Sequence, residues 1–144
     1  LNELQNHFAV IGLDFSREAC HQAKMRVKNV VRGDLHRMPF KKHFDVVFNQ
    51  SVVQVEADPR QALRDMLSVT KRGGHVIFTV PKKHSIFHLL EFLGPLNPVK
   101  WPSHATYWDE AGIRQIVSPF SKTVEIHPIW HGQLLVIVIK TDDK

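Results

Sequence analysis

Two aspartates in this sequence each close a short apolar run. Asp14 ends the run over residues 8–14, and Asp34 ends the run over residues 29–34. A carboxylate at the end of a buried strand can accept hydrogen bonds from both hydroxyls of a ribose. Asp34 could equally accept from the exocyclic amine of an adenine, and Gly33 would let the backbone approach the base closely. Each aspartate alone is also typical of a helix N-terminus or a turn. The pair, one strand apart, favours a nucleotide-like ligand.

A third apolar run, over residues 43–49, leads into Asn49 and Gln50. Ligands of open α/β sheets bind at the carboxyl ends of the strands. Three such ends would carry Asp14, Asp34 and Asn49. The three together are a more specific signal of a ligand site than any one of them alone.

The elements that must position these residues alternate between strand and helix. Helices are predicted from Ser16, which caps the first, through residue 27, from Asp58-Pro59 through residue 70, and over residues 108–117. Gly73-Gly74 is predicted to stop the second helix. Further strands are predicted over residues 75–80, 123–127 and 134–139, the last two pairing antiparallel. This pattern predicts an α/β fold: a doubly wound, mostly parallel Rossmann-like sheet with an antiparallel C-terminal hairpin.

The segment at about residues 82–107 is rich in aromatic residues, proline and histidine, and we interpret it as a lid-like insertion. Trp101, His104, Tyr107 and Trp108 are candidates for lining a substrate pocket. Packing within the lid explains the same residues equally well, because aromatic side chains bury large areas wherever they lie.

Bulk properties narrow the possible functions. The 144 residues predict one domain, and the net charge of +5 comes from basic residues that are scattered along the chain. Nucleic acid is therefore an unlikely partner. No apolar run predicts a membrane span. The single cysteine, Cys20, excludes an internal disulfide and favours a cytoplasmic location, and no metal site is predicted.

Several stretches resemble the motifs of class I S-adenosylmethionine-dependent methyltransferases. VIGLDFS (10–16) resembles the motif after the glycine-rich loop, RGDL (32–35) with MPF (38–40) resembles motif II, and FDVVF (44–48) resembles motif IV. LRDML (63–67) and KRGGHVI (71–77) resemble the helix and strand that follow. The resemblance is detailed over about residues 4–81 and loose beyond. The subgroup that it resembles most, often called type 11, methylates small molecules.

The resemblance implies S-adenosylmethionine as the cofactor and assigns residues to it. Asp14 would hold the ribose, Phe15 would pack near the adenine, and Gly33, Asp34 and Leu35 would contact the adenine amine and ring. Asn49 and Gln50 would border the methionine moiety and the path of the methyl group. The segment after Pro81 would cover a small-molecule acceptor, and no catalytic residue is assigned.

The chain departs from the family in one respect. The glycine-rich loop and the central strand precede the ribose-binding acid, but only 13 residues precede Asp14. Residues 1–7 fit the tail of the helix after that loop. We therefore expect a partial domain, either a fragment of a longer protein or a chain that pairs with another molecule, with two unpaired sheet edges and exposed apolar faces. A non-catalytic module without a complete cofactor site is the alternative function. A nicotinamide-dependent oxidoreductase shares the acid after the second strand, but Gly33-Asp34 and Gly73-Gly74 favour the methyl-donor family.

Overall fold

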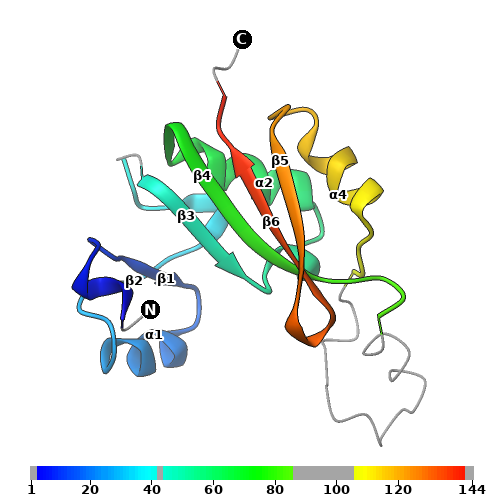
Figure 1. The fold of residues 1–144 in the computed structure, drawn as a ribbon. Helices are drawn as coiled ribbons and strands as arrows, with labels where there is room; N and C mark the ends of the chain where they lie inside the picture. The colour runs from blue at the N-terminus through cyan, green and yellow to red at the C-terminus, as the bar shows by residue number, and fades with distance from the viewer. Residues whose placement is uncertain (1–2, 42–43, 86–105, 142–144) are drawn as a thin grey trace, which may run out of the picture. The chain divides into compact units, whose positions relative to one another are not determined.

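The structure is a computed structural model that describes residues 3–41, 44–85 and 106–141 (Figure 1). The chain forms two compact units, residues 1–41 and residues 42–144. The single domain over residues 1–144 stays a prediction. Most of the expected insertion at residues 82–107 lies outside the described residues. No helix in the described ranges is both long enough and apolar enough to cross a membrane.

The first unit is a small parallel sheet with one α-helix. Its elements are η1 (Leu4–Asn6), β1 (Gly12–Asp14), α1 (Arg17–Lys24), β2 (Val30–Arg32) and η2 (Leu35–Arg37). The two strands pair in parallel, from Gly12 opposite Val30 to Asp14 opposite Arg32. The predicted cap is confirmed, since Ser16 Oγ accepts a hydrogen bond from the amide of Ala19 at 3.2 Å.

The first strand is shorter than predicted. A strand was expected over residues 8–14, but β1 begins only at Gly12, and the side chain of Phe8 is 67% exposed. The pairing partner sets this length, because β2 offers only residues 30–32 to the ladder. An apolar run predicts burial, whereas a strand also needs backbone partners along its length.

The second unit is a four-stranded sheet with the order β3-β4-β6-β5. Its elements are β3 (Phe44–Gln50), η3 (Val53–Val55), α2 (Pro59–Ser68), β4 (Thr70–Pro81), α4 (Glu110–Val117), β5 (Val124–Ile129), η5 (Trp130–Gly132) and β6 (Gln133–Ile139). β3 pairs with β4 in parallel, while β6 pairs antiparallel with both β4 and β5. The predicted α/β class and the antiparallel C-terminal hairpin are confirmed, and the sheet is mixed.

One face of the four-stranded sheet carries the core, and α2 and α4 pack against it (Figure 1). The buried sheet residues are directly opposite one another in the ladder: Val76 with Val138, Phe78 with Val136, and Val80 with Leu134. The predicted apolar faces of both helices are buried, with Ala62, Leu63, Met66 and Leu67 on α2 and Ile113, Ile116 and Val117 on α4.

The end of α2 differs from the prediction. Gly73-Gly74 was expected to stop this helix, but the helix ends at Ser68 and both glycines lie in β4. Lys140 satisfies the end of the helix, because its Nζ donates to the carbonyl oxygens of Leu67 and Thr70 at 2.9 and 3.1 Å. The glycines instead lie where the pairing of β3 with β4 shifts register, between Phe44 and Val46.

The two sheets match the expectation of unpaired edges. Among the described residues, β1 pairs only with β2 and β3 only with β4. Val46 and Phe48 on β3 are each 51% exposed. The expected combination of open strand edges and exposed apolar side chains is therefore present.

Candidate functional site

Asp14 and Gly33 are joined at the carboxyl ends of β1 and β2. The amide of Gly33 donates to the carbonyl oxygen of Asp14 at 3.0 Å, one residue beyond the strand ladder. The Asp14 side chain is exposed, and its Oδ1 accepts from the amide of Ser16 at 2.8 Å. No partner is present for its Oδ2 in the part of the chain that the structure describes. That second oxygen is available to a ligand hydroxyl.

Asp34 repeats this arrangement on the neighbouring strand. Its Oδ1 accepts from the amide of His36 at 2.9 Å and so caps the short helix η2, which begins at Leu35. Asp34 and Leu35 are both half-buried. A carboxylate beside a half-buried leucine can accept from an amine while the leucine contacts a flat apolar ring.

Gly33 lies in close contact with the side chains of two neighbours. A Cβ atom at this position would lie 2.8 Å from Leu13 Cδ1 and 3.2 Å from Pro39 Cδ. Asp14, Gly33, Asp34 and Leu35 therefore belong to one compact strand-end cluster of the first unit. Their roles toward a cofactor stay predictions.

Phe15 follows Asp14 directly, and its ring is 71% exposed. The Arg32 guanidinium lies 5.9 Å from the centre of this ring, and Arg32 Nε donates to the carbonyl oxygen of Phe15 at 3.1 Å. A cation over the ring face is attracted by the ring quadrupole. The packing of Phe15 near an adenine stays a prediction.

Asn49 and Gln50 close β3 in the second unit. Asn49 is half-buried, and its Oδ1 accepts from the amide of Val52 at 3.3 Å, across a turn in which Ser51 has a φ of 60°. Gln50 is exposed and lies opposite Thr79 in the ladder. Neighbouring strand residues point to opposite faces of a sheet, so the two amides cannot both border one ligand from the same face.

Two of the four candidate substrate residues can be located. Trp101 and His104 lie outside the described residues. Tyr107 and Trp108 are half-buried, and the amide of Trp108 donates to the carbonyl oxygen of Pro81, the last residue of β4, at 2.9 Å. Trp108 thus lies at the carboxyl end of a strand, where ligands of such sheets bind.

Sequence reasoning missed two buried polar residues near the same strand ends. Gln54 is 1% exposed and Thr79 is 5% exposed. Gln54 Oε1, Thr79 Oγ1 and Trp108 Nε1 are buried without a hydrogen-bond partner in the described part of the second unit. A buried polar group without a partner is costly, which makes it a candidate ligand contact. No sequence signal marks Gln54 or Thr79, because their burial depends on tertiary packing.

Ion pairs involve residues at or beside β3 and β4, and one of them joins Lys83 to Asp109 at 3.9 Å. Lys71 Nζ lies 2.7 Å from Asp45 Oδ1 at the start of β3, and this hydrogen bond lowers the pKa of Asp45 below its usual value. Within the ranges that the structure describes, no three histidine, cysteine, aspartate or glutamate side chains come together as metal ligands do.

The methyltransferase domain family matches residues 1–78 of the chain. The chain belongs to this family. The match runs from before β1 into β4 and includes both strand-end aspartates.

Two curated relatives share part of the sequence of this methyltransferase domain. A malonyl-[acyl-carrier protein] O-methyltransferase of Herminiimonas arsenicoxydans is 33% identical over 89 residues, 61% of this chain and 34% of the relative. A 37.1 kDa protein in a transposon of Streptomyces fradiae is 35% identical over 83 residues, 54% of this chain and 24% of the relative. The aligned part spans about a quarter to a third of these relatives.

Solved structures share the fold of the domain. Magnesium protoporphyrin IX methyltransferase of Synechocystis, solved with bound SAH, has a TM-score of 0.72 at 18% identity, over 95% of this chain and 66% of that one. A possible histamine N-methyltransferase of Thermotoga maritima has a TM-score of 0.75 at 17% identity, over 97% and 75%. These likenesses establish the Rossmann-like methyltransferase fold.

Proposed function

We propose that this chain is part of an enzyme that transfers a methyl group from S-adenosylmethionine to a small molecule. The single observation that carries the proposal is the pair of aspartates at the ends of β1 and β2, linked through the hydrogen bond from Gly33 to Asp14. Family membership supplies the reaction class. The roles of individual residues are part of the proposal.

The strand-end cluster fits the adenosine part of this cofactor. Asp14 and Asp34 each use one carboxylate oxygen for a backbone amide, from Ser16 and His36 respectively. These short turns fix both carboxylates and leave the second oxygen of each without a partner among the described residues. Asp14 would orient the ribose through its hydroxyls, and Asp34 would accept from the adenine amine.

The bound cofactor supplies a sulfonium that is already a strong methyl donor. The protein then contributes orientation of the acceptor and exclusion of water. Gln54, Thr79 and Trp108 are suited to the first task, because each offers a buried polar atom without a protein partner in the described second unit. Gln54 Oε1 could accept from an acceptor hydroxyl or amine, and Trp108 Nε1 could donate.

A small-molecule acceptor agrees with the relatives' names. One methylates a malonyl group carried by a protein, and one structural neighbour is named for magnesium protoporphyrin IX. The cytoplasmic location is part of the same proposal and rests on the single, buried Cys20.

Calorimetric titration with S-adenosylmethionine and with its demethylated product tests the proposal. We expect saturable binding, and we expect Asp14→Ala to weaken it at least about tenfold, since charge-assisted hydrogen bonds contribute about 1.5–3 kcal/mol. Glu3→Ala is the matched control, because it removes an exposed carboxylate of the same unit without a side-chain cap hydrogen bond.

Two results would count against the proposal. Equal weakening by Glu3→Ala would mean that net charge, rather than the ribose contact, governs binding. A folded chain that binds neither compound would favour the alternative of a non-catalytic methyltransferase-like module.

A further inference from the structure

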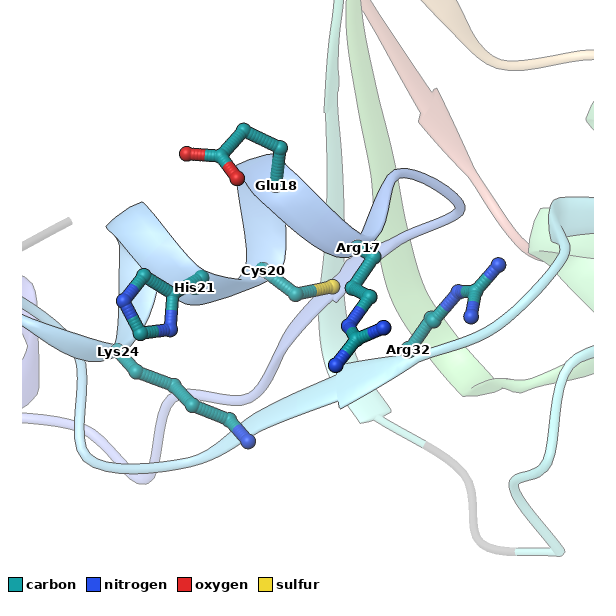
Figure 2. Close-up of a pocket in the computed structure, with 6 residues that line it drawn as sticks. All are labelled: Arg17, Glu18, Cys20, His21, Lys24 and Arg32. Atoms are coloured by element: carbon teal, nitrogen blue, oxygen red, sulfur yellow. The ribbon is translucent and has the colours of Figure 1, made fainter.

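A basic groove of about 830 Å³ lies in the first unit, and neither strand-end aspartate is among its lining residues (Figure 2). Its lining residues come from α1 and from β2: Arg17, Glu18, Cys20, His21, Lys24 and Arg32. Ligand sites in proteins commonly have volumes of about 300–1,000 Å³, so the groove has the size of a small-molecule site.

The spacing along α1 directs cationic side chains into this groove. Arg17, His21 and Lys24 are four and three residues apart, which places them on one face of the helix. Arg32 ends β2, and Figure 2 shows Arg17 and Lys24 extending from the helix toward that strand. Three permanent cations and one histidine therefore line one concavity.

These cations have no acidic partner in the described residues. The one acid that lines the groove is Glu18, and its Oε1 accepts from Gln22 Nε2 at 3.2 Å. Figure 2 shows the Glu18 carboxylate directed away from the side on which Arg17 and Lys24 lie. A concavity lined mainly by cations attracts anions.

Arg32 is held in place by the protein itself. Its Nε donates to the carbonyl oxygen of Phe15 at 3.1 Å, and its guanidinium lies 5.9 Å from the centre of the Phe15 ring. These contacts use only part of the donor capacity of the side chain, since a guanidinium has five N–H groups. The remaining donors are in place before a ligand arrives, which lowers the entropy cost of binding.

We propose that the groove between α1 and β2 binds a ligand through its phosphate group. Arginine forks match phosphate oxygens in a bidentate way, and Lys24 adds a point charge beside them. A carboxylate has fewer oxygens and one negative charge, so it satisfies three cations less well. The site is additional to the proposed methyl transfer, because S-adenosylmethionine carries no phosphate.

Titration of the ¹⁵N-labelled chain with inorganic phosphate and with pyrophosphate, followed by NMR, tests the proposal. We expect saturable shifts at the amides of α1 and at Arg32, with pyrophosphate binding more tightly because of its higher charge. Arg17→Gln and Lys24→Gln together should weaken pyrophosphate binding at least about tenfold. Both side chains are exposed, and neither makes a side-chain hydrogen bond or ion pair within the described residues, so these substitutions should leave the fold intact.

The matched control is Arg26→Gln with Lys28→Gln, which removes the same charge from exposed residues that do not line the groove. This control should bind pyrophosphate as the unchanged chain does. Equal weakening in the control, or shifts that rise without saturation and vanish in moderate chloride, would overturn the proposal.

Two further titrations separate this site from other possibilities. If a short single-stranded DNA bound far more tightly than pyrophosphate, the phosphate group would belong to a nucleic acid. If pyrophosphate then failed to compete with the DNA, the groove would not be the binding site and the proposal would be overturned. Binding of the demethylated cofactor should be unchanged in Arg17→Gln/Lys24→Gln. The proposed function and the phosphate site can therefore fail independently.

Discussion

The backbone amide of Gly33 donates a hydrogen bond to the carbonyl oxygen of Asp14 at 3.0 Å. This bond continues the pairing of β1 with β2 past the last ladder position, Asp14 opposite Arg32. It sets the separation between the turns that hold the two strand-end aspartates. The geometry of the proposed adenosine site therefore depends on a residue without a side chain.

Replacing Gly33 by alanine should disturb that geometry. The new Cβ would lie 2.8 Å from Leu13 Cδ1 and 3.2 Å from Pro39 Cδ, so these two side chains must shift. We expect a loss of about 1–3 kcal/mol in the free energy of unfolding, the usual cost of overpacking, together with weaker binding of the demethylated cofactor. Urea unfolding and calorimetry measure the two effects.

Gly12→Ala is the control for this substitution. Its Cβ would meet Val30 Cγ2 at 3.6 Å, an ordinary contact, on the same pair of strands. A loss of cofactor affinity as large in Gly12→Ala as in Gly33→Ala would show that the Gly33 position has no special role.

The adjacent glycines of β4 should respond differently to substitution. A Cβ at Gly74 would lie 2.8 Å from the carbonyl oxygen of Lys71 and 2.9 Å from that of Asp45, and backbone atoms cannot easily give way. Gly73 has open space but a φ of 71°. We expect Gly74→Ala to lower the free energy of unfolding by about 3 kcal/mol or more, and Gly73→Asn by less than about 1 kcal/mol.

Urea unfolding of both variants checks this prediction. Gly73→Ala is a useful third variant, because alanine tolerates a positive φ less well than asparagine does. If Gly74→Ala were as stable as the unchanged chain, Gly74 could not lie so close to the carbonyl oxygens of Lys71 and Asp45.

The ion pair between Lys71 and Asp45 should make stability depend on pH. Their hydrogen bond lowers the pKa of Asp45, so the folded chain holds this proton less tightly than the unfolded chain. The contribution to stability is complete above the pKa of unfolded aspartate and is lost as the pH falls through the lower folded pKa. Both side chains are exposed, so salt should weaken the effect.

NMR titration of the Asp45 carboxyl group in Lys71→Met measures this effect. The pKa of Asp45 should rise toward its usual value in this variant. Lys122→Met, which removes an exposed lysine elsewhere in the same unit, should leave it unchanged. An Asp45 pKa that stays low without Lys71 would assign the shift to the backbone instead.

Local signals in the sequence predicted the starts of α1 and α2 correctly. Ser16 and Asp58 cap their helices as expected, and Asp58 Oδ1 accepts from the amides of Arg60 and Gln61. A cap depends only on residues within one turn, so the sequence contains the whole signal. The apolar faces of α2 and α4 were predictable for the same reason.

Features that depend on distant residues were not predictable. α2 ends at Ser68 rather than at the glycine pair. The carbonyl oxygen of Leu67, at this end of the helix, accepts a hydrogen bond from Lys140 Nζ, which lies 73 residues further along the chain. The start of β1 depends on the length of β2. Among the candidate site residues, the two aspartates could be found from strand ends, whereas Gln54 and Thr79 are buried only through tertiary packing.

The open edge of β3 has a consequence for how this chain behaves at high concentration. An exposed strand edge offers unpaired backbone N–H and C=O groups to a strand of another chain. The exposed side chains of Val46 and Phe48 would add apolar contacts to such pairing. The opposite edge strand, β5, contains Pro128, which cannot donate to an added strand. On β3, Asp45 is the one charged residue between Phe44 and Gln50. Its carboxylate is thus the one side-chain charge on this strand that opposes pairing with another chain.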